Sequence, residues 1–241
     1  MDHKKHILSY TRRAVDDYQM IQKGDKIAIG VSAGKDSLAL LCSMATLKRF
    51  YPIPFELLAI TVDMGFEGGS DFSSIAKLCE TLEVPYKVVP SEIAKIVFDV
   101  RKEPSPCSLC AKLRRGALHN AAKAEGCTSV ALGHHFDDAV ETFMLNLFYE
   151  GRIGCFQPVT YLSRVGLRVI RPLLYAPEKE VSHFVRASSI VPVPKNCPAD
   201  GNTRREDAKR ALAELEHRDR GVKMRIFNAF VNTLNEKDGL K

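Results

Sequence analysis

The sequence predicts an α/β fold in which a doubly wound parallel sheet is followed by a helical C-terminal extension. Short apolar runs rich in β-branched residues alternate with helical patterns, as is typical of strands buried on both faces of a sheet. Apolar residues make up 45% of the 241 residues, which is enough for a sizeable core. The alternation weakens beyond Gly151. These observations together indicate one large domain with an appended segment.

Each element follows from its own local pattern. The strand runs are continuous and apolar, and Pro177 suits the first turn of a helix because no N–H is needed there. Strands are expected over residues 27–31, 57–62, 86–89, 129–132 and 166–173. Helices are expected over residues 1–24, 36–49, 72–83, 111–124, 137–149, 177–188, 203–217 and 222–234.

On this basis the chain divides into an N-terminal helix (1–24), an α/β domain (25–190) and a C-terminal segment (191–241). The last segment holds a Pro-rich loop and two polar helices, which we expect to pack on the same domain. Sheets of this kind bind ligands at the carboxyl ends of their strands, where the strand order switches. The loops that follow the strands ending near residues 31, 62 and 132 are therefore expected to carry the chemistry.

Composition narrows the class of protein. The first residues are charged and do not resemble a signal peptide, and the apolar runs are far shorter than the ~18 residues of a membrane span. We therefore expect a cytoplasmic protein with no membrane partner. Seven cysteines, an odd number spread along the chain, favour reduced thiols or metal ligands over a disulfide framework. The net charge of +6 is compatible with an RNA partner but does not establish one.

A small polar loop joins the first strand to the helix that follows it. It consists of Ser32, Ala33, Gly34, Lys35, Asp36 and Ser37. Small residues let backbone N–H groups approach an anion, and the start of the helix adds partial positive charge. The loop is neither a Walker A loop, which needs Ser or Thr after the Lys, nor a GxGxxG dinucleotide loop. The alternative is a plain strand-to-helix turn capped by Ser32 or Asp36.

Polar residues also follow the strands that end near residues 62 and 132. Asp63 and Met64 come directly after the earlier of the two. The later one is followed by the segment Gly133-His134-His135-Phe136-Asp137-Asp138. Its two aspartates open a helix, where carboxylates are favoured by the helix dipole. Both places can thus be binding loops or ordinary Asp-capped turns.

Three cysteines stand apart from the other four. Cys107 and Cys110 form a C-x-x-C pair that can ligate a metal or cluster, or act as a redox pair. Cys197 lies in a polar, Pro-flanked loop that has no core to join. The remaining cysteines are expected to be buried hydrophobic residues: Cys42, Cys79, Cys127 and Cys155.

These segments together resemble a known family. Residues 32–37 are similar to the Ser-Gly-Gly-x-Asp-Ser signature of the PP-loop ATP pyrophosphatases, which cleave ATP to AMP and pyrophosphate. Residues 133–138 resemble the Gly-His-His-x-Asp-Asp segment of the tRNA-modifying members. With the three cysteines, the resemblance extends over nearly the whole chain to the tRNA 2-thiocytidine synthetases. Ala33 departs from the signature glycine, and a positive φ there would make alanine less stable by about 1 kcal/mol.

The resemblance implies a Rossmann-like PP-loop fold with ATP, Mg²⁺ and a [4Fe–4S] cluster as cofactors. Lys35 and the loop amides would hold the phosphates, and Asp36 would place Mg²⁺. The cluster would be held by Cys107, Cys110 and Cys197. Contacts to the nucleotide are implied for residues 32–37 and for Asp63, Met64, Gly133 and His134. The catalytic set is Asp36, Asp137 and the three cluster cysteines.

The implied reaction is tRNA thiolation. ATP adenylates the C2 oxygen of a pyrimidine, with cytidine favoured over uridine, and sulfide then displaces AMP. The implied partners are tRNA, a cysteine desulfurase or other sulfide donor, and a second copy of the chain in a homodimer. The candidates for contact with tRNA phosphates are Arg114, Arg115, Arg171, Arg204 and Arg205.

Three other functions remain open on the residues. A lysidine-synthetase-like ligase would share the phosphate loop but need no cluster cysteines. A PP-loop amidotransferase partner would use ammonia, and nothing in the sequence argues for it. A zinc-stabilised nucleotide-binding module would need a fourth ligand beside the three cysteines, which His119 or His183 could supply.

Overall fold

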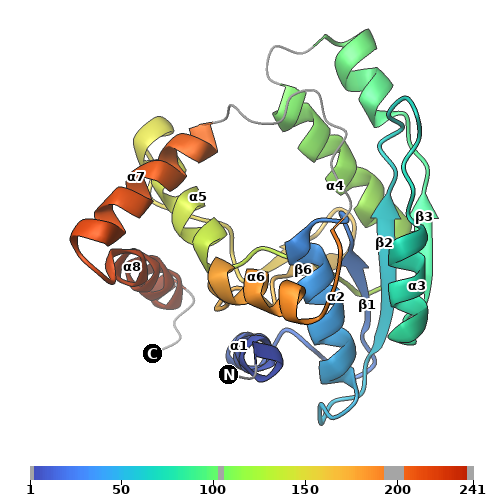
Figure 1. The fold of residues 1–241 in the computed structure, drawn as a ribbon, viewed down its shortest axis with the longest axis horizontal. Helices are drawn as coiled ribbons and strands as arrows, with labels where there is room; N and C mark the ends of the chain where they lie inside the picture. Colours follow the sequence, from blue (N-terminus) through green and yellow to red (C-terminus); the bar gives the residue numbers. More distant parts are fainter. Residues whose placement is uncertain (1–2, 103–105, 193–203, 238–241) are drawn as a thin grey trace.

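A six-stranded sheet forms the centre of the computed structural model, which describes residues 3–102, 106–192 and 204–237. Its strand order is β3-β2-β1-β4-β6-β5 (Figure 1). All neighbouring strands pair in parallel except β5 and β6, which are antiparallel. The strands are β1 (Lys26–Gly30), β2 (Glu56–Val62), β3 (Tyr86–Val89), β4 (Ser129–Ala131), β5 (Val159–Leu162) and β6 (Leu167–Ile170).

Helices cover both faces of this sheet. They are α1 (His3–Asp17), α2 (Lys35–Lys48), α3 (Ser73–Thr81), α4 (Pro106–Ala124), α5 (Phe136–Tyr149), α6 (Glu178–Ala187), α7 (Arg204–Arg218) and α8 (Val222–Lys237). Ile27 and Ile29 of β1 face a core shared with α1, α2, α3 and α6. Ala28 faces the opposite core, to which α4 contributes Leu118 and Ala122. The predicted doubly wound fold is thus confirmed.

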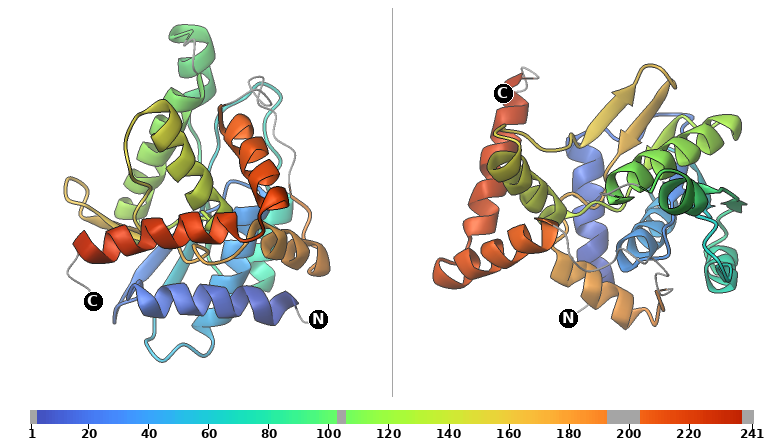
Figure 2. Two further views of the ribbon diagram at one scale, coloured as in Figure 1. Left: turned by 90° about the vertical axis from the view of Figure 1, so that its left-hand side faces the viewer. Right: turned by 90° about the horizontal axis from the view of Figure 1, so that it is seen from above.

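The C-terminal helices pack on α5, where a third apolar cluster forms. Phe136 of α5, Leu212 of α7 and Phe227 of α8 are buried in it, and the two phenylalanine rings lie 4.8 Å apart between centroids. Figure 2 shows α7 and α8 beside α5, on the side of the molecule away from α3 and β3. The rotation of α7 is therefore fixed by apolar contacts with α5.

The structure differs from the sequence predictions at several places. Helix α1 ends at Asp17, not at residue 24, and β6 ends at Ile170, not at residue 173. The edge strand β5 was not predicted, because its four residues are partly exposed and form no continuous buried run. Helix α4 begins at Pro106, not at residue 111, so the C-x-x-C pair lies inside its first turns. A short π-helical turn, η1 (Lys95–Val100), precedes it. Within the described residues, no helix is both long and apolar enough to cross a membrane.

A buried ion pair joins three strands at the amino edge of the sheet. Asp25 precedes β1 and is 5% exposed, and both of its carboxylate oxygens accept bonds from Arg168 of β6 at 2.5 and 2.6 Å. Thr128, just before β4, donates its hydroxyl to the same carboxylate at 2.7 Å. This edge is opposite the carboxyl ends of the strands, so the pair stabilises the sheet away from the predicted site.

Candidate functional site

The predicted phosphate loop lies between β1 and α2, at the carboxyl edge of the sheet (Figure 1). Ala33 has φ 63°, in the left-handed region where glycine is more stable. Gly34 precedes the first helical residue, and no side chain of the described residues caps α2. The capped-turn alternative is therefore not supported, and the N–H groups of the first turn point toward the loop as they would toward an anion.

Hydrogen bonds within the loop fix its shape. Ser37 is 5% exposed, and its hydroxyl donates to Gly34 O at 2.9 Å. The same oxygen accepts from the backbone N–H of Ser32 at 3.1 Å. The buried Ser37 side chain thus shapes the loop. The exposed Ser32, whose hydroxyl donates to Ser37 Oγ at 3.3 Å, lies at the surface together with the backbone amides and Lys35.

Lys35 is held by two carboxylates. Its ammonium nitrogen lies 3.0 Å from Asp36 Oδ1 and 3.2 Å from Glu178 Oε1 at the start of α6. Burial acts to lower the pKa of Lys35, but the two carboxylates raise it above its ordinary value. Glu178 also pairs with Lys209 of α7, at 3.0 Å between Oε2 and Nζ. Although burial acts against ionisation, Lys209 and Lys35 bring the pKa of Glu178 down to about 2.

The segment after β4 lies directly against the phosphate loop. A Cβ atom added to Gly133 would come within 3.0 Å of the carbonyl of Asp36 and 3.1 Å of Ser37 N. Only glycine allows this close approach without a shift of the backbone. His135 then caps α5, since its Nδ1 accepts from Asp138 N at 3.3 Å and the Asp138 carboxylate accepts from His135 N at 3.0 Å. Two motifs that are about a hundred residues apart in sequence thus form one site.

Asp36 has one oxygen suited to a metal ion. Its Oδ1 is buried and accepts no hydrogen bond within the described residues, although Lys35 Nζ lies 3.0 Å away. Carboxylate oxygens are the ligands that Mg²⁺ prefers, and the ion binds through one or two carboxylates together with substrate phosphates. The position of this oxygen beside the phosphate loop therefore fits the Mg²⁺ expected there.

Asp63 and Met64 form a tight turn after β2. Asp63 Oδ1 accepts from Gly65 N at 3.1 Å, and the carbonyl oxygen of Asp63 accepts from the Ser91 hydroxyl at 2.6 Å. Gly65 has φ 71°, and a Cβ there would meet Ser91 O at 2.3 Å. Both predicted residues are half-buried at the carboxyl edge of the sheet. Their contact with adenosine stays a prediction.

Asp137 joins three helices. It is 8% exposed, and its Oδ2 accepts from the backbone N–H of Glu178 at 2.7 Å. Its Oδ1 pairs with Lys223 of α8 at 2.8 Å. Both oxygens thus hold α5, α6 and α8 together, which supports an anchoring role, and the catalytic role expected from the sequence stays a prediction.

His134 and Arg171 form a buried group beside Phe156. The His134 ring lies 4.9 Å from the Phe156 ring between centroids, and the Arg171 guanidinium lies 4.8 Å from the same ring. Burial, with Arg171 nearby, lowers the pKa of His134 to about 4, so the imidazole is neutral at pH 7. Arg171 is 9% exposed and donates to Gln157 O. The expectation that Arg171 contacts RNA phosphate is therefore wrong, because the side chain is in the core.

Cys107 and Cys110 lie on the first turns of α4, three residues apart, so both thiols are on one side of the helix. Cys107 is exposed and Cys110 is half-buried. Since α4 connects two parallel strands and runs against them, it begins on the same side of the sheet as the phosphate loop, beyond the carboxyl ends of the strands (Figure 1). Cys197, the third predicted ligand, lies outside the described residues.

The zinc-module alternative receives no support from the described residues. None of their His, Cys, Asp and Glu side chains form a group of three or more that could hold a metal ion. His119 follows Cys110 by nine residues on the same helix, which places it ~13 Å along the axis, too far to share one metal ion. Cys42, Cys79 and Cys127 are buried as expected, and Cys155 is half-buried with its thiol pKa raised to about 12 by burial.

Comparisons with known proteins agree with this geometry. A family model described as a PP-loop domain matches residues 5–215. A Geobacter metallireducens protein named tRNA-cytidine(32) 2-sulfurtransferase is 38% identical over 223 residues, which is 91% of this chain and 86% of the relative. The chain belongs to the PP-loop tRNA 2-sulfurtransferase family. A further member with the same name, from Geobacter sulfurreducens, is 37% identical over 95% of this chain and 90% of its own length.

Solved structures with the same fold add a second comparison. The U34-tRNA thiolase NcsA from Methanococcus maripaludis, solved with its [4Fe–4S] cluster, matches with a TM-score of 0.77 and 26% identity. The match covers 96% of this chain and 80% of that one. The NH₃-dependent NAD synthetase from Campylobacter jejuni matches with a TM-score of 0.50 and 13% identity, which indicates a shared fold alone.

Sequence reasoning missed Glu178 and Lys209, which lie beside the phosphate loop. Nothing in the local pattern marks them, because each is one of many charged residues on an amphipathic or polar helix. The one usable signal is Pro177, which begins α6 and brings Glu178 to the helix start. Glu178 contacts Lys35, and Lys209 contacts Glu178, only because α6 and α7 pack around the end of the sheet.

Proposed function

We propose that this family member is an ATP- and [4Fe–4S]-dependent enzyme that thiolates C2 of a cytidine in tRNA. The observation that carries the proposal is that the phosphate loop, Gly133 and the C-x-x-C pair all lie on the side of the sheet where its parallel strands end. The relatives named tRNA-cytidine(32) 2-sulfurtransferase support cytidine, at the position in their name, over uridine. The cluster of NcsA supports an iron–sulfur group at the cysteines.

The chain's own residues suit activation of a carbonyl oxygen. Lys35 and the N–H groups at the start of α2 are placed to bind the phosphates, and Asp36 Oδ1 would hold a Mg²⁺ ion, which would supply further positive charge. Attack of the C2 oxygen of the base on the α-phosphate then releases pyrophosphate, whose developing negative charge Lys35 and the backbone N–H groups stabilise. The neutral His134 adds no charge to the binding pocket.

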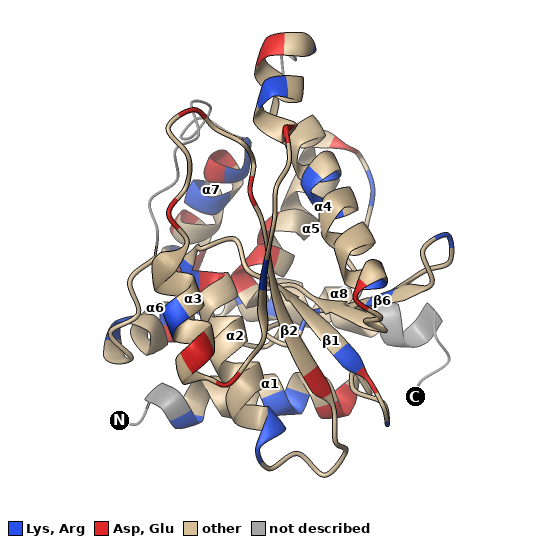
Figure 3. Cartoon of the chain, turned by 90° about the vertical axis from the view of Figure 1, so that its right-hand side faces the viewer, with Lys and Arg blue, Asp and Glu red and all other residues tan. Residues whose placement is uncertain are grey.

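Replacement of oxygen by sulfur requires a second group at the same edge. A cluster held by Cys107, Cys110 and Cys197 would supply sulfide to the activated C2, and AMP would leave. Arg114 and Arg115 are exposed on the helix that begins with the two cysteines, and Figure 3 shows basic positions along α4. Phosphate contacts from this helix would bring one base of a tRNA loop to the cysteines.

Further parts of the proposal concern the cellular setting. The sulfur has to come from a cysteine desulfurase or other sulfide donor, because the chain holds no sulfur beyond its own side chains. We place the reaction in the cytoplasm, where tRNA is modified. A homodimer is proposed from the family resemblance, and the exposed apolar residues at the end of α5 are the candidate contact: Leu147, Phe148, Tyr149 and Ile153.

The test is a reconstituted reaction under strict anaerobiosis. Protein with about one [4Fe–4S] cluster per chain, supplied with ATP, Mg²⁺, sulfide and unmodified tRNA, should release pyrophosphate and AMP and form 2-thiocytidine. Cys107→Ala should abolish thiolation and the visible absorbance of the cluster, whereas Cys79→Ala, a change in the core, should keep both. Release of ADP and phosphate, or stoichiometric zinc in place of iron, would refute the proposal.

A further inference from the structure

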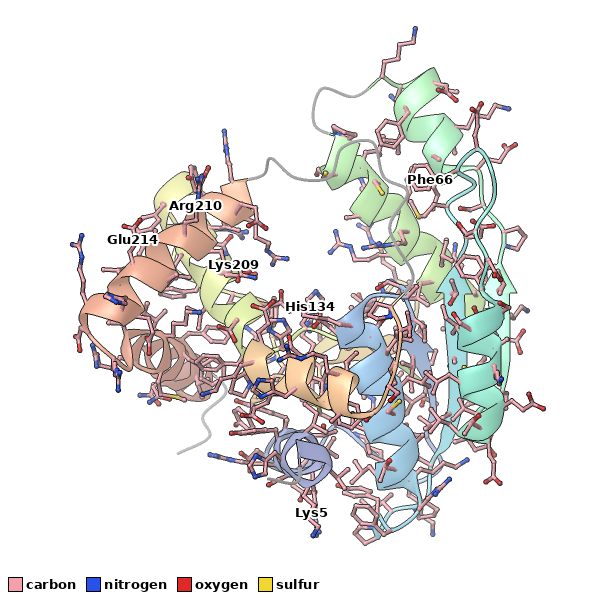
Figure 4. The ribbon with its side chains drawn as sticks, viewed as in Figure 1. Lys5, Phe66, His134, Lys209, Arg210 and Glu214 are labelled. Carbon is pink, nitrogen blue, oxygen red and sulfur yellow. The ribbon has the colours of Figure 1, made fainter. Side chains whose placement is uncertain are left out.

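Lys209 of α7 is placed as if to bind the same anion as Lys35. The Oε1 atom of Glu178 lies 3.2 Å from Lys35 Nζ and 3.2 Å from Lys209 Nζ. One carboxylate oxygen therefore brings an ammonium group of the phosphate loop and one of the C-terminal extension to the same point. Figure 4 shows Lys209 on the side of α7 turned toward the centre of the molecule, where His134 lies, and Arg210 and Glu214 on its outer side.

The position of Lys209 follows from the packing of α7. Ala208 and Leu212 are buried, the leucine against α5, and Lys209 beside them is half-buried, whereas Arg210 is exposed. Arg205, one turn earlier, lies 3.5 Å from the buried Glu141. The Lys209 side chain is 43% exposed, and ion pairs between exposed side chains add little to stability. The packing of α7 accordingly does not require a lysine here.

The phosphate loop itself carries little positive charge. Lys35 is its only cation among residues 32–37, and Asp36 beside it offsets that charge. ATP carries several negative charges on its phosphates, and Mg²⁺ neutralises only part of them. Burial opposes the charge of Lys209, but Glu178 raises its pKa, so the ammonium group is present at pH 7.

We infer that Lys209 is a second phosphate-binding lysine, which contacts the pyrophosphate portion of ATP together with Lys35. Glu178 is a positioning residue that holds both ammonium groups before the nucleotide binds and gives up contacts to its phosphates. The inference rests on the proposed function, since it needs ATP in the phosphate loop. It also makes the C-terminal extension part of the ATP site, although the PP-loop signature ends at Ser37.

The test compares Lys209→Met with Lys209→Arg and with the control Arg210→Met. Arg210 is the next residue, faces outward and pairs with Asp207, so its loss removes the same charge from the same helix. Calorimetric titration with Mg²⁺ present should show ATP and pyrophosphate bound about ten- to a hundredfold more weakly by Lys209→Met. AMP, which lacks the β- and γ-phosphates, should bind as in the wild type. Lys209→Arg should restore most of the loss, and the unfolding temperatures should agree.

The outcomes separate the two proposals. If Lys209→Met weakens the binding of AMP as much as that of ATP, Lys209 does not bind the β- and γ-phosphates and the inference is overturned. The same conclusion follows if the affinity for ATP stays within twofold of the wild type. Thiolation by the wild type would still stand in that case. If the wild type itself binds neither ATP nor pyrophosphate at the loop, the proposed function fails and the inference falls with it. An equal loss in Arg210→Met would also overturn the inference, because a general field effect would explain both.

Discussion

Replacing Asp137 by Asn should weaken the junction of three helices and leave the chemistry intact. In the folded chain one carboxylate oxygen accepts from Glu178 N at 2.7 Å and the other pairs with Lys223 at 2.8 Å. Asparagine keeps one acceptor, so the bond to the backbone survives. The charged contact is lost, because the NH₂ group of asparagine and the ammonium group of Lys223 are both hydrogen-bond donors.

The magnitude follows from the burial of the pair. Hydrogen bonds to charged groups contribute about 1.5–3 kcal/mol, and Asp137 is only 8% exposed, so the loss should lie in this range. For a chain of this size each kcal/mol lowers the melting temperature by about 2–4 °C, which predicts a fall of about 3–12 °C. Lys223→Met should produce a similar fall. The double variant should lose less than the sum of the two, because the partners interact directly.

The assay pairs thermal unfolding, followed by circular dichroism, with tRNA-dependent pyrophosphate release at a temperature where every variant is folded. Asp137→Asn should release pyrophosphate within about threefold of the wild type under those conditions, which corresponds to under ~1 kcal/mol in the barrier. A variant with an unchanged melting temperature and a hundredfold slower reaction would refute the anchoring role. Asp137 would then act on the substrate, as the sequence pattern first indicated.

Three further outcomes can be checked on the same protein. Ala33→Gly should change the free energy of unfolding by less than about 1 kcal/mol, since relief of the positive φ is offset by loss of a buried methyl group, whereas Ala33→Val should lower it markedly and impair ATP binding. Arg168→Met should lower the free energy of unfolding in urea by about 3–5 kcal/mol, because Asp25 is left buried without its cation, and a loss below ~1 kcal/mol would contradict this. The pKa of His134 is lowered to about 4, so its contribution to stability is present above its ordinary pKa near 6.5 and is lost as the pH falls toward 4. Burial raises the pKa of Glu141 to about 7, so its contribution is present below its ordinary pKa near 4.5 and is lost as the pH rises through 7. Urea denaturation gives the free energy of unfolding at each pH between 4 and 8. Relative to the wild type, His134→Gln and Glu141→Gln should change the slope of this free energy against pH in opposite directions. Changes of the same sign would show that one of the two groups titrates normally.

Local sequence predicted those parts of the site whose geometry is local. The turn predicted from residues 32–37 lies between β1 and α2, with Lys35, Asp36 and Ser37 in the first turn of the helix, and its binding of an anion stays a prediction. Gly133 was predicted as a neighbour of the nucleotide, and its close approach to Asp36 explains why glycine occupies the position. In both cases the backbone conformation and the residue type carry the information together.

The parts that were not predicted depend on contacts between distant segments. Asp137 opens α5, as expected, but its direction is decided by Lys223, which is 86 residues away in sequence. Arg171 resembles a surface arginine until Phe156 and the end of β6 enclose it. Charged residues on polar helices carry no local mark of their partners, so pairs such as Glu178 with Lys209 emerge only in three dimensions.

The strand order has a consequence for the chain during its synthesis. β1 is a central strand, yet one of its two neighbours, β4, is formed by residues 129–131. Residues follow one another from the ribosome at about 5–20 per second, so one side of β1 stays without its partner for roughly 5–20 s. During that time its apolar residues and unpaired backbone groups form an edge that other chains can join. The nascent protein therefore passes through an aggregation-prone stage, and chaperones that bind apolar strands should associate with it until residue 131 has emerged.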